Sequence, residues 1–538
     1  MQKRWNNKVA VLACGDLSWC SNDNAEHTFI RAAATLLAAA LAIVCYAWWV
    51  QKFTKSVPPL PPGPPGLPIL GNLPFLQPDL HRYFSKLSQI YGPIIKLQLG
   101  SKTCIVVSSA SVAKKVLKDN DAIFANRDPP TVAIIGTYGG CDMAWRSNCP
   151  EWRKLRRLVV REIMTNTSLD VCSALRRREV REMVKDIYGK VGSPVNIGDQ
   201  MFLTILNVIL SMLWGGSLHG EERSRLGIEF RQVVAEFVEL LGAPNISDLF
   251  PILTRFDLQG YQSRMKKALA WLDEILESVI AHRRKADQPD VGEGTNKEQS
   301  KDFLQLLLEL NQHGDYKSSL SINEVKALLL DMVVGGTDTT STTIEWAMTE
   351  LLRHPDELRR VVEELDRVVG AGNIVEESHL PQLVYLDAAI KETLRFHPPL
   401  PLLVPRSPNT TCTVDGYTIP KDSRVLFNAW AMQRDPELWE CPLRFEPERF
   451  LKDAEKGNYL GNNFHFIPFG FGRRICVGIP LAEKMVTHVL ATLLHSFEWK
   501  LPDGTEPDIQ EKFEIVLKKM EPLVAIPAAR LPSSEQYQ

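Results

Sequence analysis

The chain has 538 residues, with 62 Lys and Arg against 64 Asp and Glu, so its formal charge of −2 lacks the basic excess of a nucleic-acid binder. A hydrophobic fraction of 45% and a charged fraction of 23% are those of a folded protein. These values exclude a disordered tail protein, a collagen and a polytopic transporter. The 10 cysteines form no CxxC pair and are sparse, so we expect neither a structural zinc site nor a disulfide framework.

The first expected element is an uncharged apolar run at residues 32–50, which follows a polar extension at residues 1–31. As a helix, this run would span about 28 Å, close to the hydrocarbon thickness of a bilayer. It predicts a single transmembrane anchor, with a buried core helix as the alternative. Lys52 and Lys55 follow the run, whereas only Arg31 closely precedes it, and this distribution favours a cytosolic body.

Prolines crowd the next segment, residues 51–68. Because proline fixes φ and forbids both a helix and a central strand, we expect a semi-rigid hinge between the anchor and the body at residues 69–538. A ligand for an SH3-type domain is the alternative interpretation.

The body is predicted to be mostly α with a smaller β portion. Alternating apolar positions within residues 69–110 indicate a hairpin of strands, and helical spacing dominates residues 111–284. A polar loop at 285–301 separates these helices from another helical region at 321–396. Residues 398–418 mix prolines with short strand-like pieces, and no internal repeat is present.

The sharpest motif is FGFGRRICVG at residues 469–478, which fits F-x-x-G-x-R-x-C-x-G. Gly472 and Gly478 permit a tight turn with close backbone approach, and Arg474 offers a fork suited to a carboxylate. A buried free cysteine in a glycine-rich loop is the alternative. The motif resembles the haem-binding signature of cytochrome P450 monooxygenases, in which a thiolate ligates the iron and favours O–O cleavage. The resemblance implies that Cys476 is the metal ligand.

A second motif, Gly335-Gly336-Thr337-Asp338-Thr339, lies within a predicted buried helix. Each glycine costs a helix about 1 kcal/mol against alanine, and a threonine hydroxyl can bond to the preceding turn. The composition therefore indicates a groove, with a simple kink as the alternative. The run resembles the oxygen-binding motif of the same family. By that match, Asp338 supplies the proton path and Thr339 orders water and dioxygen.

The resemblance also implies the cofactor, haem b, and the side chains that hold it. Trp152 and Arg156 fit a W-x-x-x-R helix that meets a haem propionate, although a plain basic helical face would also place Arg156 there. The full set of implied haem contacts is Trp152, Arg156, Gly335, Gly336, Arg406, Phe469, Arg474 and Gly478.

A structural triad is expected beside the haem loop. Glu392 and Arg395 lie three apart on one helix face, and Arg449 follows in a PERF segment. By resemblance, these three side chains form a buried Glu-Arg-Arg cluster, in which removal of one member would leave an uncompensated charge.

Four segments would face the substrate by the same resemblance. They are mostly aliphatic, which predicts a small apolar substrate, and Tyr138 and Glu514 are their polar candidates. The candidate pocket residues are Ile134, Ile135, Tyr138, Val334, Leu402, Leu403 and Ile515.

The motifs most resemble plant microsomal enzymes, in the group of terpenoid hydroxylases and flavonoid 3′-hydroxylases. This implies insertion of one oxygen atom from O2 into a specialised metabolite, a terpenoid first and a flavonoid or phenolic compound as the alternative. Electrons would come from NADPH through cytochrome P450 reductase at the endoplasmic reticulum membrane, and cytochrome b5 is a further candidate donor. A haem-thiolate isomerase or dehydratase and a haem-binding sensor are the rival interpretations.

Overall fold

The computed structural model describes residues 34–35, 37–46, 58–215, 220–286, 302–313, 319–460, 463–502 and 506–538. The predicted extension at 1–31 lies outside the described residues, as do parts of the predicted anchor and hinge. Within the predicted anchor, a short apolar helix spans Leu37–Tyr46. Its apolar side chains are exposed, with Leu37 and Ile43 each at 68%.

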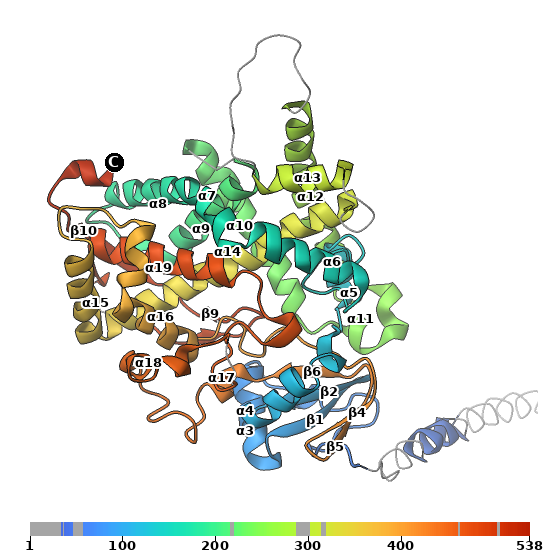
Figure 1. The fold of residues 1–538 in the computed structure, drawn as a ribbon. Helices are drawn as coiled ribbons and strands as arrows, with labels where there is room; N and C mark the ends of the chain where they lie inside the picture. The colour runs from blue at the N-terminus through green and yellow to red at the C-terminus, as the bar shows by residue number, and fades with distance from the viewer. Residues whose placement is uncertain are drawn as a thin grey trace, which may run out of the picture.

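Helices form most of the body, and Figure 1 shows them filling its upper part, while β1, β2, β4, β5 and β6 gather at the lower edge. This confirms the predicted mostly α fold with a smaller β portion. The described α-helices are α3 (Leu80–Tyr91), α4 (Ala110–Lys114), α5 (Thr131–Gly136), α6 (Pro150–Leu158), α7 (Asn166–Val171), α8 (Ser173–Tyr188), α9 (Ile197–Trp214), α10 (Gly220–Gly242), α11 (Ile246–Leu249), α12 (Tyr261–Ala286), α13 (Phe303–His313), α14 (Ile322–Arg353), α15 (Pro355–Val368), α16 (Val384–Phe396), α17 (Ala429–Met432), α18 (Glu448–Lys452) and α19 (Ile479–Ser496).

The strands form four small sheets. In the first, β1 and β2 are an antiparallel hairpin, as predicted, and β6 adds to β2 in parallel. The others are β3-β10-β7, β4-β5 and β8-β9. The strand bounds are β1 (Ile94–Leu99), β2 (Lys102–Val107), β3 (Val195–Asn196), β4 (Cys412–Val414), β5 (Tyr417–Ile419), β6 (Arg424–Phe427), β7 (Phe497–Lys500), β8 (Glu511–Lys512), β9 (Lys518–Lys519) and β10 (Val524–Ala529).

The described part of the proline segment is fastened to these strands. Pro62 O accepts a hydrogen bond from Lys96 N at 2.8 Å, and Pro59 O accepts one from Thr418 N at 2.8 Å. A Cβ on Gly63 would overlap the carbonyl oxygen of Lys96. These prolines therefore belong to the edge of the body instead of standing free of it as a spacer, because their carbonyl groups complete strand hydrogen bonds.

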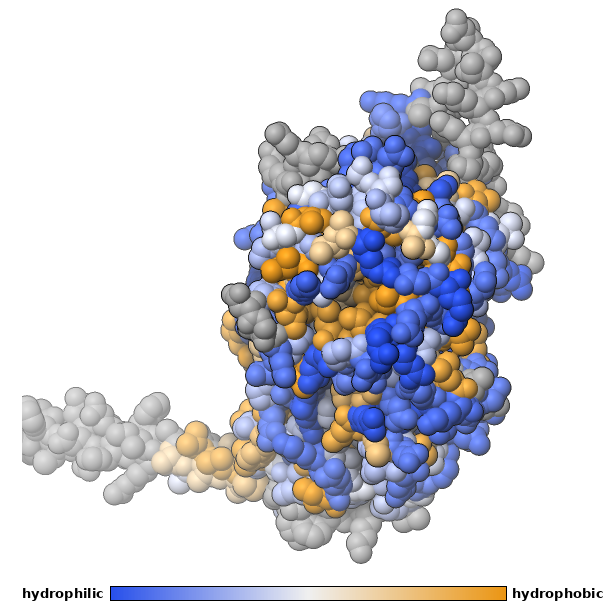
Figure 2. Space-filling model, turned by 90° about the vertical axis from the view of Figure 1, so that its left-hand side faces the viewer, coloured by the Kyte–Doolittle hydropathy of each residue, from blue (hydrophilic) through white to orange (hydrophobic). Residues whose placement is uncertain are grey.

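The core is built around α14, which a capping box starts at Ser321 and Glu324. Among the described residues, one helix, α9, is long and apolar enough to cross a membrane, but 83% of it is buried inside the body. It packs against α14 as a core helix. Figure 2 shows that the body surface is mainly hydrophilic around an apolar hollow.

His488 on α19 gives the core a pH dependence that can be measured. Its side chain is 1% exposed, and burial lowers its pKa to about 4. The pKa of histidine in the unfolded chain is about 6.5. The contribution of neutral His488 to the free energy of unfolding is therefore fully present above pH 6.5, and up to about 3 kcal/mol of it is lost as the pH falls toward 4. We expect His488→Gln to lessen the fall of the thermal midpoint between pH 7 and 5. The exposed His282→Gln serves as control, and an unchanged slope in His488→Gln would contradict the assignment.

Candidate active site

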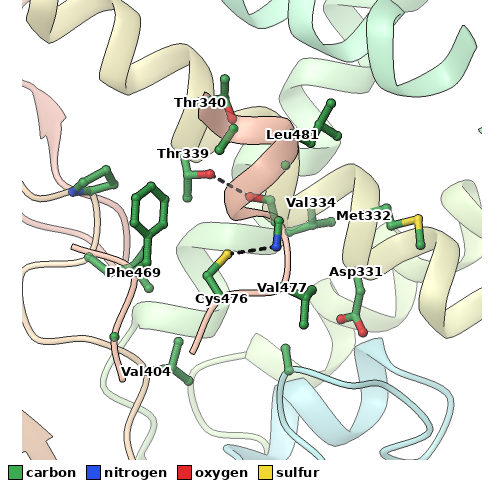
Figure 3. Close-up of a pocket in the computed structure, with 18 of the residues that line it drawn as sticks. Asp331, Met332, Val334, Thr339, Thr340, Val404, Phe469, Cys476, Val477 and Leu481 are labelled. Carbon is green, nitrogen blue, oxygen red and sulfur yellow. Dashed lines mark hydrogen bonds between the residues drawn. The ribbon is translucent and has the colours of Figure 1, made fainter. Parts of the chain in front are cut away.

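A cavity of about 410 Å³ lies between α14, α9, α10 and the loop that carries Cys476. Figure 3 shows Cys476 and Phe469 on one side of this space and Val334, Thr339 and Thr340 from α14 on the other. The wall is mainly apolar and includes Ile205, Ile209, Met212, Leu213, Phe237, Val238, Leu241, Val334, Leu400, Leu403, Ile515 and Val516.

The Cys476 loop is held by its own backbone. Cys476 N donates to Phe469 O at 3.0 Å, and Gly478 N donates to Cys476 Sγ at 3.3 Å. Gly472 has φ of +69°, and a Cβ there would lie 2.7 Å from Leu117 O. Only glycine fits this approach, so the sequence motif fixes the position of the sulfur.

The environment of Cys476 opposes a free thiolate. The side chain faces the cavity from deep inside the protein, and desolvation raises the pKa of the thiol. The Gly478 N–H and the Arg156 guanidinium lower that pKa in part. A metal ion bound to the sulfur would therefore supply most of the charge that displaces the proton.

Arginine side chains gather beside this loop. Arg474 Nε donates to Ala125 O at 2.7 Å, and its guanidinium lies 3.9 Å from the centroid of the Trp152 ring. Burial lowers the pKa of Arg474 to about 9, and the nearby Arg406 and Arg156 add to the effect. Trp152 Nε1 donates to Met143 O at 3.0 Å, so the ring is fixed beneath the guanidinium.

Arg156 and Arg406 complete the predicted cationic set. Arg156 Nη2 donates to Ile475 O at 2.8 Å, and Arg406 Nη1 lies 3.2 Å from Asp121 Oδ1. Burial lowers the pKa of Arg406 to about 10, and Asp121 offsets this only in part. Because the same carboxylate also pairs with Arg473, positive charge at this end of the cavity exceeds the negative charge. The thiol, the apolar walls and this cationic end together fit a haem with its propionates.

The glycine-threonine segment of α14 lies along the cavity. Thr339 Oγ1 donates to Gly335 O at 2.7 Å, the back-bond that the composition predicts, and α14 runs without a break through it. A Cβ on Gly336 would lie 2.8 Å from Ile209 Cδ1, whereas none would be obstructed at Gly335. Asp338 does not line the cavity, because its side chain points toward β9 and lies 2.9 Å from Lys518 Nζ.

The structure brings Glu392, Arg395 and Arg449 together in a buried cluster. Glu392 Oε2 lies 2.7 Å from Arg395 Nε, and Glu392 Oε1 lies 3.0 Å from Arg449 Nε. Arg395 Nη1 also donates to Gln433 O at 2.8 Å. The cluster ties α16 to α18 and to the segment before the Cys476 loop.

Three predicted substrate residues, Val334, Leu403 and Ile515, line the cavity. Ile134, Ile135, Tyr138 and Leu402 are not among its lining residues.

The placement of the excluded residues has a physical reason. The segment at α5 packs on α12, where the Tyr138 hydroxyl donates to Asp273 Oδ1 at 2.6 Å. Ile134 is 43% exposed, and Leu402 packs against the cluster around β1 and β2.

Arg127 and Asp331 are among the further polar residues that line the cavity. Arg127 Nη1 donates to Val404 O at 2.7 Å, and Met143 N donates to Asp331 Oδ2 at 2.7 Å. Burial, with the Asp142 carboxyl nearby, raises the pKa of Asp331 well above its ordinary value. No local sequence pattern marked Asp331 for the cavity, because long-range packing brings it there.

This combination of a cysteine-bearing loop, an apolar cavity and a glycine-threonine helix defines a haem-thiolate enzyme. The chain belongs to the cytochrome P450 family, whose model matches residues 61–526. It is 38% identical to carnosic acid synthase of Salvia pomifera over 86% of this chain and 92% of the relative. It is 37% identical to flavonoid 3′-monooxygenase CYP75B4 of Oryza sativa subsp. japonica, over 91% of this chain and 95% of the relative. The structure of a zebrafish cytochrome P450 with progesterone superposes on this chain with a TM-score of 0.70 and 27% sequence identity. The match covers 84% of this chain and 99% of the zebrafish chain.

The family match establishes the enzyme class and its cofactors. The chain is a cytochrome P450 monooxygenase of the plant terpenoid and flavonoid hydroxylase group, and it uses haem with a cysteine thiolate as iron ligand. It consumes dioxygen and electrons derived from NADPH, so it requires a redox partner and a small substrate.

Proposed function

We propose that Cys476 ligates the haem iron and that the enzyme hydroxylates a small apolar terpenoid. The observation that carries this proposal is the Cys476 sulfur at the cavity, with Gly478 N–H donating to it at 3.3 Å. The bound haem supplies the activation of dioxygen, and the chain's own residues hold the cofactor, exclude water and orient the substrate.

The haem contacts follow from the same geometry. Arg156, Arg406 and Arg474 would bind the two propionates, with Arg127 as a fourth donor. Trp152 fixes Arg474 by ring contact. The cation excess at this end supports the assignment, because an anionic group would remove the cost of burying unpaired guanidinium groups.

The other predicted site residues lie in the Cys476 loop and on α14. Phe469 and Gly478 shape the loop around the sulfur, and on α14 Gly335 leaves open space whereas Gly336 accommodates the Ile209 side chain. Thr339 orders water in the cavity, and Asp338 supplies protons to it from the other side of the helix.

The substrate class rests on the cavity wall. Val334, Leu403 and Ile515 present aliphatic surface, which favours a terpenoid skeleton. A flavonoid or phenolic compound is the second candidate, because the relatives include both carnosic acid synthase and flavonoid 3′-monooxygenases.

Residues 32–50 anchor the chain in the endoplasmic reticulum membrane, and residues 69–538 form the cytosolic catalytic domain. The short apolar helix Leu37–Tyr46, with exposed side chains, supports this arrangement. The redox partner is NADPH-cytochrome P450 reductase, with cytochrome b5 as a further donor.

Two measurements test this function. The reduced holoenzyme with carbon monoxide is expected to show the red-shifted Soret band of thiolate ligation. Turnover with reductase and NADPH is then measured on matched terpenoid and flavonoid panels. A band typical of nitrogen ligation would overturn the metal site, and turnover of flavonoids alone would overturn the terpenoid assignment.

The role of Thr339 predicts how the electrons from NADPH are divided between product and hydrogen peroxide. In Thr339→Ala, the hydroxyl that orders water is lost, so we expect product per NADPH to fall about tenfold or more while hydrogen peroxide rises. Thr339→Ser keeps the hydroxyl and serves as the control. Unchanged coupling in the alanine variant would refute the proposed role.

A further inference from the structure

The turn between β8 and β9 carries both a cavity wall and a charged group. Ile515 and Val516 line the cavity, and Lys518 follows two residues later. The turn is held on both sides, since Trp346 Nε1 donates to Leu517 O at 3.2 Å and Leu517 N donates to Pro399 O at 2.8 Å. The position of Lys518 is therefore fixed by the packing of the substrate wall.

Lys518 points from this turn at α14. Its Nζ lies 2.9 Å from Asp338 Oδ2 and 3.6 Å from Glu514 Oε2. The Asp338 side chain is 8% exposed, and that of Lys518 is 23% exposed. Lys518 is thus the cation in contact with the buried carboxyl next to Thr339.

We propose that Lys518 is the positioning residue for Asp338, holding the carboxyl on the β9 side of α14 and setting when it can donate a proton. This inference rests on the proposed role of Asp338. Glu514 adds a carboxylate beside the lysine, because its Oε2 lies 3.6 Å from Lys518 Nζ and its Oε1 lies 2.7 Å from Lys512 Nζ.

The charges around Asp338 support this role. Burial raises the pKa of Asp338, the charge of Lys518 lowers it, Glu514 raises it, and the more distant Arg231 lowers it. Glu345, about two helical turns further along α14, accepts a hydrogen bond from Leu523 N at 2.9 Å instead. Without Lys518, the carboxyl would hold its proton to higher pH and lose its fixed direction.

The test compares three variants of the holoenzyme. Lys518→Met removes the charge, Lys518→Arg keeps it, and Lys500→Met removes the charge of a 68% exposed lysine on β7 whose ion-pair partner is Glu498. We expect Lys518→Met to lower product per NADPH about tenfold with KM unchanged, as expected for a displaced proton donor. The arginine variant restores coupling, and Lys500→Met retains it.

A spectroscopic readout separates this role from a merely structural one. The infrared carbonyl band of protonated Asp338, identified by its loss in Asp338→Asn, is titrated in each variant. Its midpoint is expected to move to higher pH in Lys518→Met and to stay near the native value in Lys518→Arg. An unmoved midpoint, or full coupling in Lys518→Met, would overturn the inference. Full coupling in Asp338→Asn would instead refute the proposed function of the carboxyl.

Discussion

Replacing Cys476 with serine is expected to abolish monooxygenation and the thiolate signature of the carbon monoxide complex. A hydroxyl does not give up its proton as a thiol does, so the variant lacks the anionic sulfur that tunes the iron. The expected loss of activity is more than about 100-fold, because mutation of even the outer partners of a metal ligand costs 10- to 100-fold.

The other cysteines provide the control for this substitution. Cys412→Ser, on the half-exposed strand β4, is expected to keep both the spectrum and the activity. The measurements are the absorption of the reduced, carbon monoxide-treated protein, haem content and product formation. A thiolate spectrum that persisted in Cys476→Ser would place the iron ligand elsewhere.

The predicted residues that the structure brings into contact belong to contiguous motifs. Cys476 and Gly478 are two residues apart, and Thr339 lies one helical turn after Gly335, so their geometry is fixed by local backbone structure. The same is true of Glu392 and Arg395 on one face of α16. Chain spacing alone was sufficient to place these side chains together.

The residues that the sequence missed reach the site through long-range packing. Lys518 meets Asp338 only because the β8–β9 turn docks on α14. Tyr138 was assigned to the substrate wall, yet its hydroxyl bonds to Asp273 on α12. The direction of a loop side chain depends on which neighbour packs against the loop, and no local pattern encodes that choice.

Glu392→Gln is expected to destabilise the fold by about 3–5 kcal/mol, although the new side chain has almost the same shape. Both Arg395 and Arg449 depend on this carboxylate, and Arg395 and Glu392 are fully buried. An amide supplies one acceptor oxygen without charge, so the buried Arg395 loses its carboxylate partner and Arg449 keeps only Glu446, at 3.6 Å.

The matched control is Glu363→Gln, a surface glutamate that lies 3.9 Å from Arg359 and is 63% exposed. Exposed pairs contribute about 0–1 kcal/mol, so this variant should melt close to the native protein. Thermal midpoints and haem retention are measured together, because the cluster supports the loop that carries Cys476. If both glutamines lowered the midpoint equally, the cluster would be no more than a solvated ion pair. A large loss in Glu392→Gln alone, accompanied by release of haem, would show that the buried charges hold the cysteine loop in place.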